Sequence, residues 1–237
     1  KACGIASIEA MPFSQILRQY LPKNDSLWES ESARLLRAIQ LPSPDKIKLA
    51  FNESEISSTE ALINEGFITS PFIALCIGGK LPDKDWGDRN WRMVLESIVA
   101  EYPKIGLLLI GAEDESARST ALADSWQGPV LNLCGKTDPR VSALAMKKAV
   151  FYLGHDTGPM HLAALMNVPC IALFSARTKP GVWFPFGDNH SIFYPWDHAV
   201  KVNNKAGFRT AGATILAIEP TDVIKSCLER LTKSLQS

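Results

Sequence analysis

Residues 150–174 read Val-Phe-Tyr-Leu-Gly-His-Asp-Thr-Gly-Pro-Met-His-Leu-Ala-Ala-Leu-Met-Asn-Val-Pro-Cys-Ile-Ala-Leu-Phe, and this stretch decides the fold class. The apolar run Val150–Leu153 predicts a buried strand, and Val168–Phe174 predicts a second one. Between them, Gly154–His161 predicts a tight turn that opens a helix over Met160–Met166. A strand, a helix and a strand in direct succession indicate a right-handed βαβ unit of a parallel sheet.

The same alternation extends over most of the chain. Four further strands are expected, at Lys46–Phe51, Phe72–Ile77, Ile105–Ile110 and Val130–Leu133. The expected helices are Trp28–Gln40, a segment capped by Ser57 and ended by Gly66, Asn90–Glu101, Glu113–Ala123, Pro139–Lys148 and a last helix from Pro220 to about Leu235. Six strands between about residues 44 and 220 predict an α/β fold with a Rossmann-like, doubly wound parallel sheet.

The domain organisation is uneven. Pro42-Ser-Pro44 is typical of a linker, so we expect one domain over residues 44–237. Residues 1–43 contain one short strand candidate, Gly4–Ile8, and one helix. They are too few for a separate domain and are interpreted as the remnant of a larger one.

Composition excludes several classes of protein. The 237 residues contain 25 Lys and Arg against 25 Asp and Glu, which argues against a nucleic-acid-binding protein. No apolar run reaches the ~18–20 residues that span a bilayer. The five cysteines are scattered and form no C-x-x-C pair, so neither a disulfide framework nor a structural zinc site is expected. A reducing, cytoplasmic setting fits best.

The turn between the two quoted strands has the features of an anion site. Thr157 can cap the helix, Gly158 lets a ligand approach the backbone, and Pro159 is tolerated in a first helical turn. The free N–H groups and the positive end of the helix suit a diphosphate. A plain capped turn is the alternative, but it would not require Asp156 and His161 as well.

Two other strand ends carry weaker signals. The loop Gly78–Trp86 offers paired glycines and the cations Lys80 and Lys84, but it lacks the P-loop pattern. It could equally be a solvated loop. Gly111-Ala-Glu-Asp-Glu115 places acids where ribose hydroxyls are bound in dinucleotide folds, although acids also favour the first turn of any helix.

Other chemistry lacks its motifs. The sequence has no G-x-G-x-x-G, H-E-x-x-H or G-x-S-x-G, and His190 and His198 lack metal-ligand spacing. The aromatic stretches Trp183–Phe186 and Phe193–Trp196 could line a pocket, but such stretches are more often loop packing.

Together these blocks resemble glycosyltransferase family 9, the heptosyltransferase-like enzymes of bacterial lipopolysaccharide assembly. The most specific match is Asp156–Ala164, and the likeness covers roughly residues 27–237. Lys84-Asp-Trp86 with Trp91, Leu109–Glu115 and Asn132–Thr137 match in the family's order. Phe174–Arg177 and Pro180–Phe186 depart from the commoner family pattern.

The resemblance implies the C-terminal, donor-binding half of a GT-B architecture. By matching, Lys84 would contact the diphosphate, and Thr157, Gly158 and the following amides would cradle it. Asp156 and His161 would lie close to the sugar and phosphates, and Glu115 would hold the ribose. The remaining donor-binding positions implied by the match are Gly79, Lys80 and Met160, together with Thr137 near the base.

The resemblance also implies inverting transfer without a metal or cofactor. The donor would be a nucleotide sugar, by likeness ADP-heptose, and the acceptor a lipid-linked or oligosaccharide molecule of lipopolysaccharide type, reached at the inner face of the bacterial inner membrane. The family's catalytic carboxylate lies in the N-terminal acceptor domain, so we assign no general base and expect this chain to bind donor without turnover. Two alternatives stay open: a GT-B-type nucleotide-sugar epimerase, and a non-catalytic nucleotide-binding domain.

Overall fold

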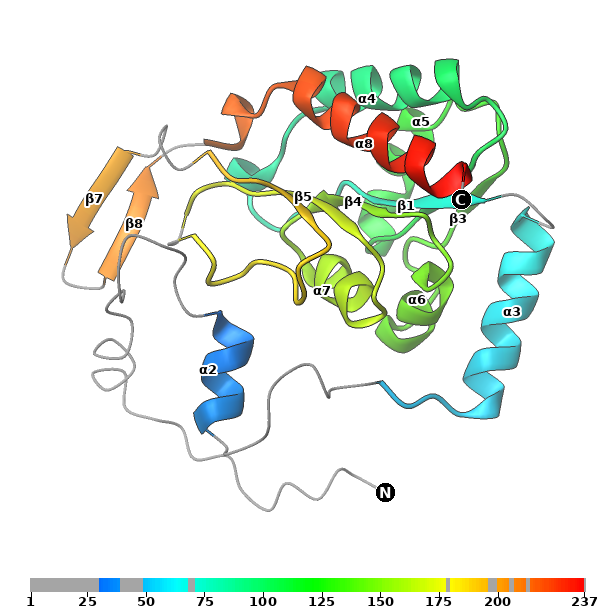
Figure 1. The fold of residues 1–237 in the computed structure, drawn as a ribbon, viewed down its shortest axis with the longest axis horizontal. Coiled ribbons are helices and arrows are strands. Elements are labelled where there is room, and N and C mark those ends of the chain that lie inside the picture. Colours follow the sequence, from blue (N-terminus) through cyan, green and yellow to red (C-terminus); the bar gives the residue numbers. More distant parts are fainter. Residues whose placement is uncertain are drawn as a thin grey trace.

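A six-stranded parallel sheet forms the centre of the protein (Figure 1). The computed structural model describes residues 30–38, 49–67, 71–177, 180–195, 200–204, 207–211 and 214–236. The strand order is β3-β2-β1-β4-β5-β6, and every neighbouring pair is parallel. The strands are β1 (Phe72–Cys76), β2 (Gly106–Leu109), β3 (Val130–Asn132), β4 (Tyr152–His155), β5 (Cys170–Leu173) and β6 (Ser191–Phe193). This confirms the predicted Rossmann-like, doubly wound sheet.

Helices cover both faces of the sheet (Figure 1). Successive residues of a strand point to opposite faces, so Ile73 and Leu75 of β1 pack into one apolar cluster while Phe72 and Ala74 pack into the other. The first face is covered by α4 (Asp88–Glu101), α5 (Ser116–Leu122) and α8 (Pro220–Leu235), and the second by α6 (Pro139–Met146) and α7 (Gly158–Leu165), with α3 (Glu53–Phe67) packed on α6. Burial on both faces explains the continuous apolar runs of β1, β2 and β5.

One strand prediction was wrong, and three strands were missed. Of the expected strand Lys46–Phe51, the described residues 49–51 form no strand, and the Phe51 ring lies 5.1 Å from the Arg140 guanidinium of α6. The sixth place in the sheet belongs to β6, whose residues are all only partly buried and therefore give no apolar run. A separate antiparallel hairpin, β7 (Val200–Asn204) and β8 (Gly207–Ala211), was not predicted either.

The first two described helices, α2 (Glu31–Ala38) and α3, begin at other residues than the sequence predicts. The Asn52 N–H donates to Glu55 Oε2 at 2.7 Å, and the Glu55 N–H donates to Asn52 Oδ1 at 2.8 Å. This reciprocal capping box starts α3 at Glu53, so the cap expected at Ser57 was wrong. Helix α2 (Glu31–Ala38) lies within the predicted range, and the Ser30 hydroxyl accepts from the Ala33 N–H at 3.2 Å.

Several expectations fall on residues that the structure does not describe. These are the strand candidate Gly4–Ile8, the linker at residues 42–44 and the domain boundary between residues 43 and 44. The two-part domain division therefore stays a prediction. None of the helices that the structure describes is long and apolar enough to cross a membrane.

The strand order places the candidate site. From β1 the chain proceeds outward through β2 to β3, then crosses back to β4 and continues outward through β5 to β6. The connections that follow β1 and β4 therefore lead toward opposite edges of the sheet, and a crevice opens at the carboxyl ends of these two strands. The loops that carry Gly78–Trp86 and Asp156–His161 meet there.

Candidate functional site

Two adjoining cavities occupy the carboxyl edge of the sheet. The first has a volume of about 410 Å³ and lies over β1, β2 and β4. The second, of about 310 Å³, lies beside it toward β5. We call them the β2 arm and the β5 arm. Both arms are lined by the same five residues at their junction: Leu81, Lys84, Asp156, Thr157 and Gly158.

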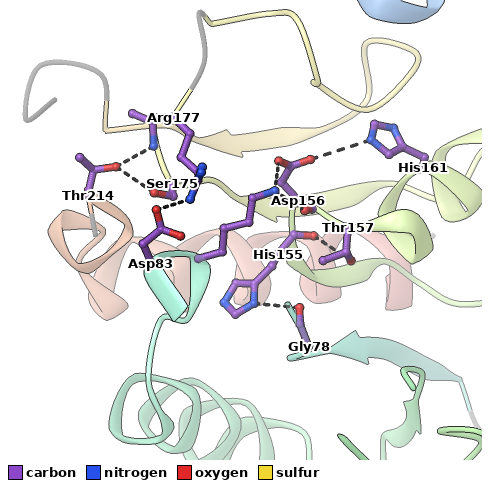
Figure 2. A network of polar contacts seen from close by, with 11 residues as sticks. Gly78, Asp83, His155, Asp156, Thr157, His161, Ser175, Arg177 and Thr214 are labelled. Atoms are coloured by element: carbon purple, nitrogen blue, oxygen red, sulfur yellow. Dashed lines mark hydrogen bonds and ion pairs between the residues drawn. The ribbon is translucent and has the colours of Figure 1, made fainter. Parts of the chain in front are cut away.

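A charged group stands at this junction. Lys84 Nζ lies 2.8 Å from Asp156 Oδ2 and also donates to the Asp156 carbonyl oxygen at 3.1 Å. The other carboxylate oxygen of Asp156 lies 3.9 Å from His161 Nε2 (Figure 2). Burial lowers the pKa of His161, and Lys84 acts in the same direction while Asp156 opposes it. The junction thus combines one cation, one carboxylate and a largely neutral imidazole.

His155 holds the Lys84 loop in place. Its Nε2 accepts from the Trp86 N–H at 3.3 Å, which leaves Nδ1 to donate to the Gly78 carbonyl at 3.2 Å (Figure 2). The side chain is fully buried, and this burial lowers its pKa to about 4. A neutral imidazole on β4 therefore connects both ends of the loop that carries Lys84.

Glu115 lies over two glycines at the ends of β1 and β2. A methyl group on Gly78 would lie 1.9 Å from Glu115 Oε1, and one on Gly111 would lie 2.4 Å from Oε2. The carboxylate accepts from the Ala112 N–H at 2.8 Å. Both glycines and Glu115 line the β2 arm. The two glycines therefore create the space in which this acid faces the cavity.

The start of α7 forms the floor shared by both arms. Gly158 is its first residue, and a Cβ there would meet nothing within 4 Å. Packing inside the chain thus does not require glycine at this position, whereas a closely bound ligand would. Thr157 occupies the N-cap position, but its side chain makes no capping hydrogen bond, so the predicted capping role was wrong. Its hydroxyl instead approaches the His155 carbonyl oxygen at 3.4 Å.

Residues that come after β5 in the chain form the side of the β5 arm farthest from the β2 arm. Arg177 pairs with Asp83, the residue before Lys84 (Figure 2). The Thr214 hydroxyl accepts from the Ala176 N–H at 2.6 Å and lies 3.3 Å from Ser175 Oγ. Ser175, Arg177 and Trp183 line this arm together with His161. This side is thus tied both to the Lys84 loop and to the segment that precedes α8.

Most of the predicted donor-binding residues meet at this site. The β2 arm contains Gly79, Lys80, Lys84, Glu115, Asp156, Thr157 and Gly158, and the β5 arm adds His161. Met160 is fully buried in the apolar cluster behind α7. Thr137 is not among the lining residues, and its hydroxyl lies 2.7 Å from Ser142 Oγ. The roles of Met160 and Thr137 toward a ligand stay predictions.

Sequence reasoning did not assign His155, Ser175 and Arg177, and it left open whether Trp183 lines a pocket or packs in a loop; Trp183 lines the β5 arm. The departure from the commoner family pattern at Phe174–Arg177 and Pro180–Phe186 was the available signal for the last three. Among the residues that the structure describes, no group of three or more His, Cys, Asp or Glu side chains could hold a metal ion.

Comparison with known proteins identifies the family. The model of glycosyltransferase family 9 (heptosyltransferase) matches residues 30–207. The chain therefore belongs to glycosyltransferase family 9. Lipopolysaccharide heptosyltransferase 3 of Escherichia coli is 32% identical over 117 residues, which are 48% of this chain and 34% of that protein.

Solved structures show the same fold. A family 9 glycosyltransferase from Veillonella parvula has a TM-score of 0.69 at 16% identity, over 86% of this chain and 60% of that one. An E. coli heptosyltransferase solved with ADP has a TM-score of 0.55 at 18% identity, over 83% of this chain and 54% of that one. The chain thus spans between about a third and three fifths of the length of these relatives.

Proposed function

We propose that this chain is the donor-binding part of a heptosyltransferase-type glycosyltransferase that transfers a sugar from a nucleoside-diphosphate sugar to a lipopolysaccharide-type acceptor. Family membership supports transferase chemistry. The observation that carries the proposal is the junction of two arms at Lys84, Asp156, Thr157 and Gly158. A nucleotide sugar has the same layout, because two uncharged ends are joined by a diphosphate.

The nucleoside occupies the β2 arm in this proposal. Glu115 projects into that arm from the end of β2, where its carboxylate can accept hydrogen bonds from ribose hydroxyls. The diphosphate lies at the junction, against Lys84 and the first amides of α7. The sugar then points into the β5 arm. There Asp156 can accept its hydroxyls, because a carboxylate facing the phosphates directly would repel them.

Transfer would proceed by attack of an acceptor hydroxyl on the anomeric carbon of the sugar. The bond to the diphosphate oxygen breaks, and its electron pair leaves with the nucleoside diphosphate. Lys84 and the α7 amides stabilise the negative charge that develops there, which needs no metal ion. The proton of the acceptor passes to a general base, which we assign to none of the described residues. Attack from the opposite face inverts the anomeric centre.

The proposed identity of the donor and the acceptor rests on the relatives of this chain. An E. coli relative was solved with ADP, and a curated relative is a lipopolysaccharide heptosyltransferase. We therefore propose ADP-heptose as donor and a lipid-linked or oligosaccharide acceptor, met at the inner face of the bacterial inner membrane by a cytoplasmic protein. We also propose that this chain by itself binds donor without turnover.

Calorimetric titration with ADP, GDP and UDP in EDTA tests donor binding. We expect one nucleotide, ADP, to bind selectively, and Lys84→Ala to weaken that binding by about tenfold or more, because the loss of a charged partner of the diphosphate is worth about 1.5–3 kcal/mol. Lys104→Ala, at an exposed lysine outside both arms, is the matched control. Absence of binding by all three nucleotides would contradict the proposal, as would equal losses in the two variants.

A further inference from the structure

Trp183 is a large aromatic side chain held at the surface of the site. It is 42% exposed and lines the β5 arm. A single exposed apolar residue is common on protein surfaces. An aromatic residue that lines a cavity between polar groups, on a segment whose backbone is fixed, is a feature of ligand sites.

The residues on both sides of Trp183 are anchored. The Val182 carbonyl accepts from the Glu31 N–H at the start of α2, at 2.8 Å. The Phe184 ring packs 5.2 Å from the Phe174 ring and 5.3 Å from the Tyr194 ring. Because Val182 and Phe184 are tethered in this way, the indole stays in the arm instead of folding into the core. Such preorganisation lowers the entropy lost when a ligand binds.

The arm around Trp183 is polar but balanced in charge. Lys84 is paired with Asp156, and Arg177 is paired with Asp83. The His161 ring lies 6.4 Å from the indole, at 67° to it, and burial lowers the pKa of this histidine. Once Lys84 turns to the diphosphate, the uncompensated charge that remains in the arm is the carboxylate of Asp156. A ligand that enters this arm meets hydroxyl and carboxylate acceptors and a guanidinium whose charge is already compensated.

We propose that Trp183 is the platform on which the ring of the transferred sugar lies, and that the β5 arm selects a neutral, hydroxylated pyranose over an acidic one. This inference rests on the proposed function. A pyranose presents C–H groups on one face, which pack on an aromatic ring, and hydroxyls around its edge. The hydroxyls can meet Asp156, Ser175 and Arg177. A sugar carboxylate would instead meet the uncompensated Asp156.

Measuring the contribution of the sugar to affinity apart from that of the nucleotide tests this inference. The nucleotide that binds in the first titration is compared with its glucose and glucuronate esters, on the unchanged chain and on Trp183→Ala. We expect Trp183→Ala to leave the affinity for the free nucleotide unchanged and to weaken the glucose ester by about fivefold to tenfold, the effect of one aromatic contact. Trp183→Phe should restore most of the loss. Leu216→Ala, at another exposed apolar residue outside the arm, should change neither affinity.

The outcomes distinguish the two proposals. Equal losses for the free nucleotide and its glucose ester in Trp183→Ala would overturn the platform role and leave the donor-binding function intact. An unchanged glucose-ester affinity in Trp183→Ala would do the same. Tighter binding of the glucuronate ester than of the glucose ester would overturn the selection of a neutral sugar. Absence of nucleotide binding by the unchanged chain would overturn the proposed function, and this inference with it.

Discussion

Replacing Gly78 with alanine moves a carboxylate without unfolding the protein. Gly78 does not have a positive φ, so its backbone accepts an L-residue. The added methyl would lie 1.9 Å from Glu115 Oε1, whereas Cβ atoms in proteins stay at least 3.0 Å from such non-bonded atoms. The carboxylate must therefore shift by at least about 1 Å. This shift breaks its 2.8 Å hydrogen bond from the Ala112 N–H.

The magnitude follows from the bonds that are lost. A hydrogen bond to a charged group is worth about 1.5–3 kcal/mol, so losing the ribose contacts proposed for Glu115 should weaken nucleotide binding by about tenfold to a hundredfold. Folding should be hardly affected, because the displaced atoms end a flexible side chain and the Ala112 N–H is exposed, so water replaces its lost partner. Alanine also restricts the unfolded chain, which favours the folded state by about 0.4–1 kcal/mol. We expect a thermal midpoint equal to or slightly above that of the unchanged chain.

Calorimetry on a double-mutant cycle is the assay. Gly78→Ala, Glu115→Ala and the combined variant are titrated with ADP, with Lys104→Ala, outside both arms, as the binding control. Gly79→Ala is the control for the thermal midpoint. A methyl on Gly79 would make only ordinary contacts, with Lys84 Cβ at 3.7 Å and His155 Nδ1 at 3.8 Å. If Gly78 acts through Glu115, Gly78→Ala has no further effect once Glu115 is alanine. An equal loss in both backgrounds would refute the reasoning, because the methyl would then meet the ligand itself.

Three more predictions concern charge, pH and packing. Asp156→Asn should strengthen ADP binding by about threefold, because it frees Lys84 from a partly exposed ion pair, and it should weaken binding of the glucose ester. Titration with both ligands checks this prediction. A weaker affinity for ADP would contradict it. The pKa of His155 is lowered from 6.5 to about 4 in the folded protein, so between these pH values the unfolded chain binds a proton that the folded chain does not. The free energy of unfolding should therefore fall as the pH drops from 6.5 toward 4, by at most about 3 kcal/mol. In denaturant unfolding, the stability of His155→Asn should fall less steeply with decreasing pH than that of the unchanged chain. The remaining pH dependence comes from His161 and His190, whose pKa values burial also lowers. An unchanged pH dependence would refute the role assigned to His155. Gly128→Ala would place a methyl 2.0 Å from the Ile105 carbonyl oxygen, and we expect about 1–3 kcal/mol lower stability in thermal unfolding, with Gly79→Ala again unchanged.

Local patterns in the sequence were sufficient for much of the sheet and for one side of the site. Strands such as β1 and β5 are buried on every residue, so their apolar runs are visible without a structure. Lys84, Glu115 and Asp156 each follow a predicted strand within a few residues. Because the carboxyl ends of parallel strands meet at one edge of the sheet, placing these residues near one another required only the strand assignments.

Contacts between distant segments were beyond reach of such patterns. The N-cap of α3 is Asn52, which follows the apolar residues that predicted a strand over Lys46–Phe51. The Phe51 ring instead packs against the Arg140 guanidinium of α6. The strand β6 is only three residues long and only partly buried, and its place is defined by parallel pairing with β5, a contact that a local hydrophobic pattern does not show.

By itself, the sequence determined the fold class and the family, and it singled out Lys84, Asp156, Thr157 and Gly158, which line the junction of the two arms. Each of these inferences depends on short runs and fixed spacings. Only the tertiary structure decided that Gly78 and Gly111 make room for Glu115, that buried His155 holds the Lys84 loop, and that Arg177 and Trp183 enclose a second arm. The physical reason is that these relations join side chains far apart in the chain. Burial, steric exclusion and charge pairing arise only once the sheet has brought them together.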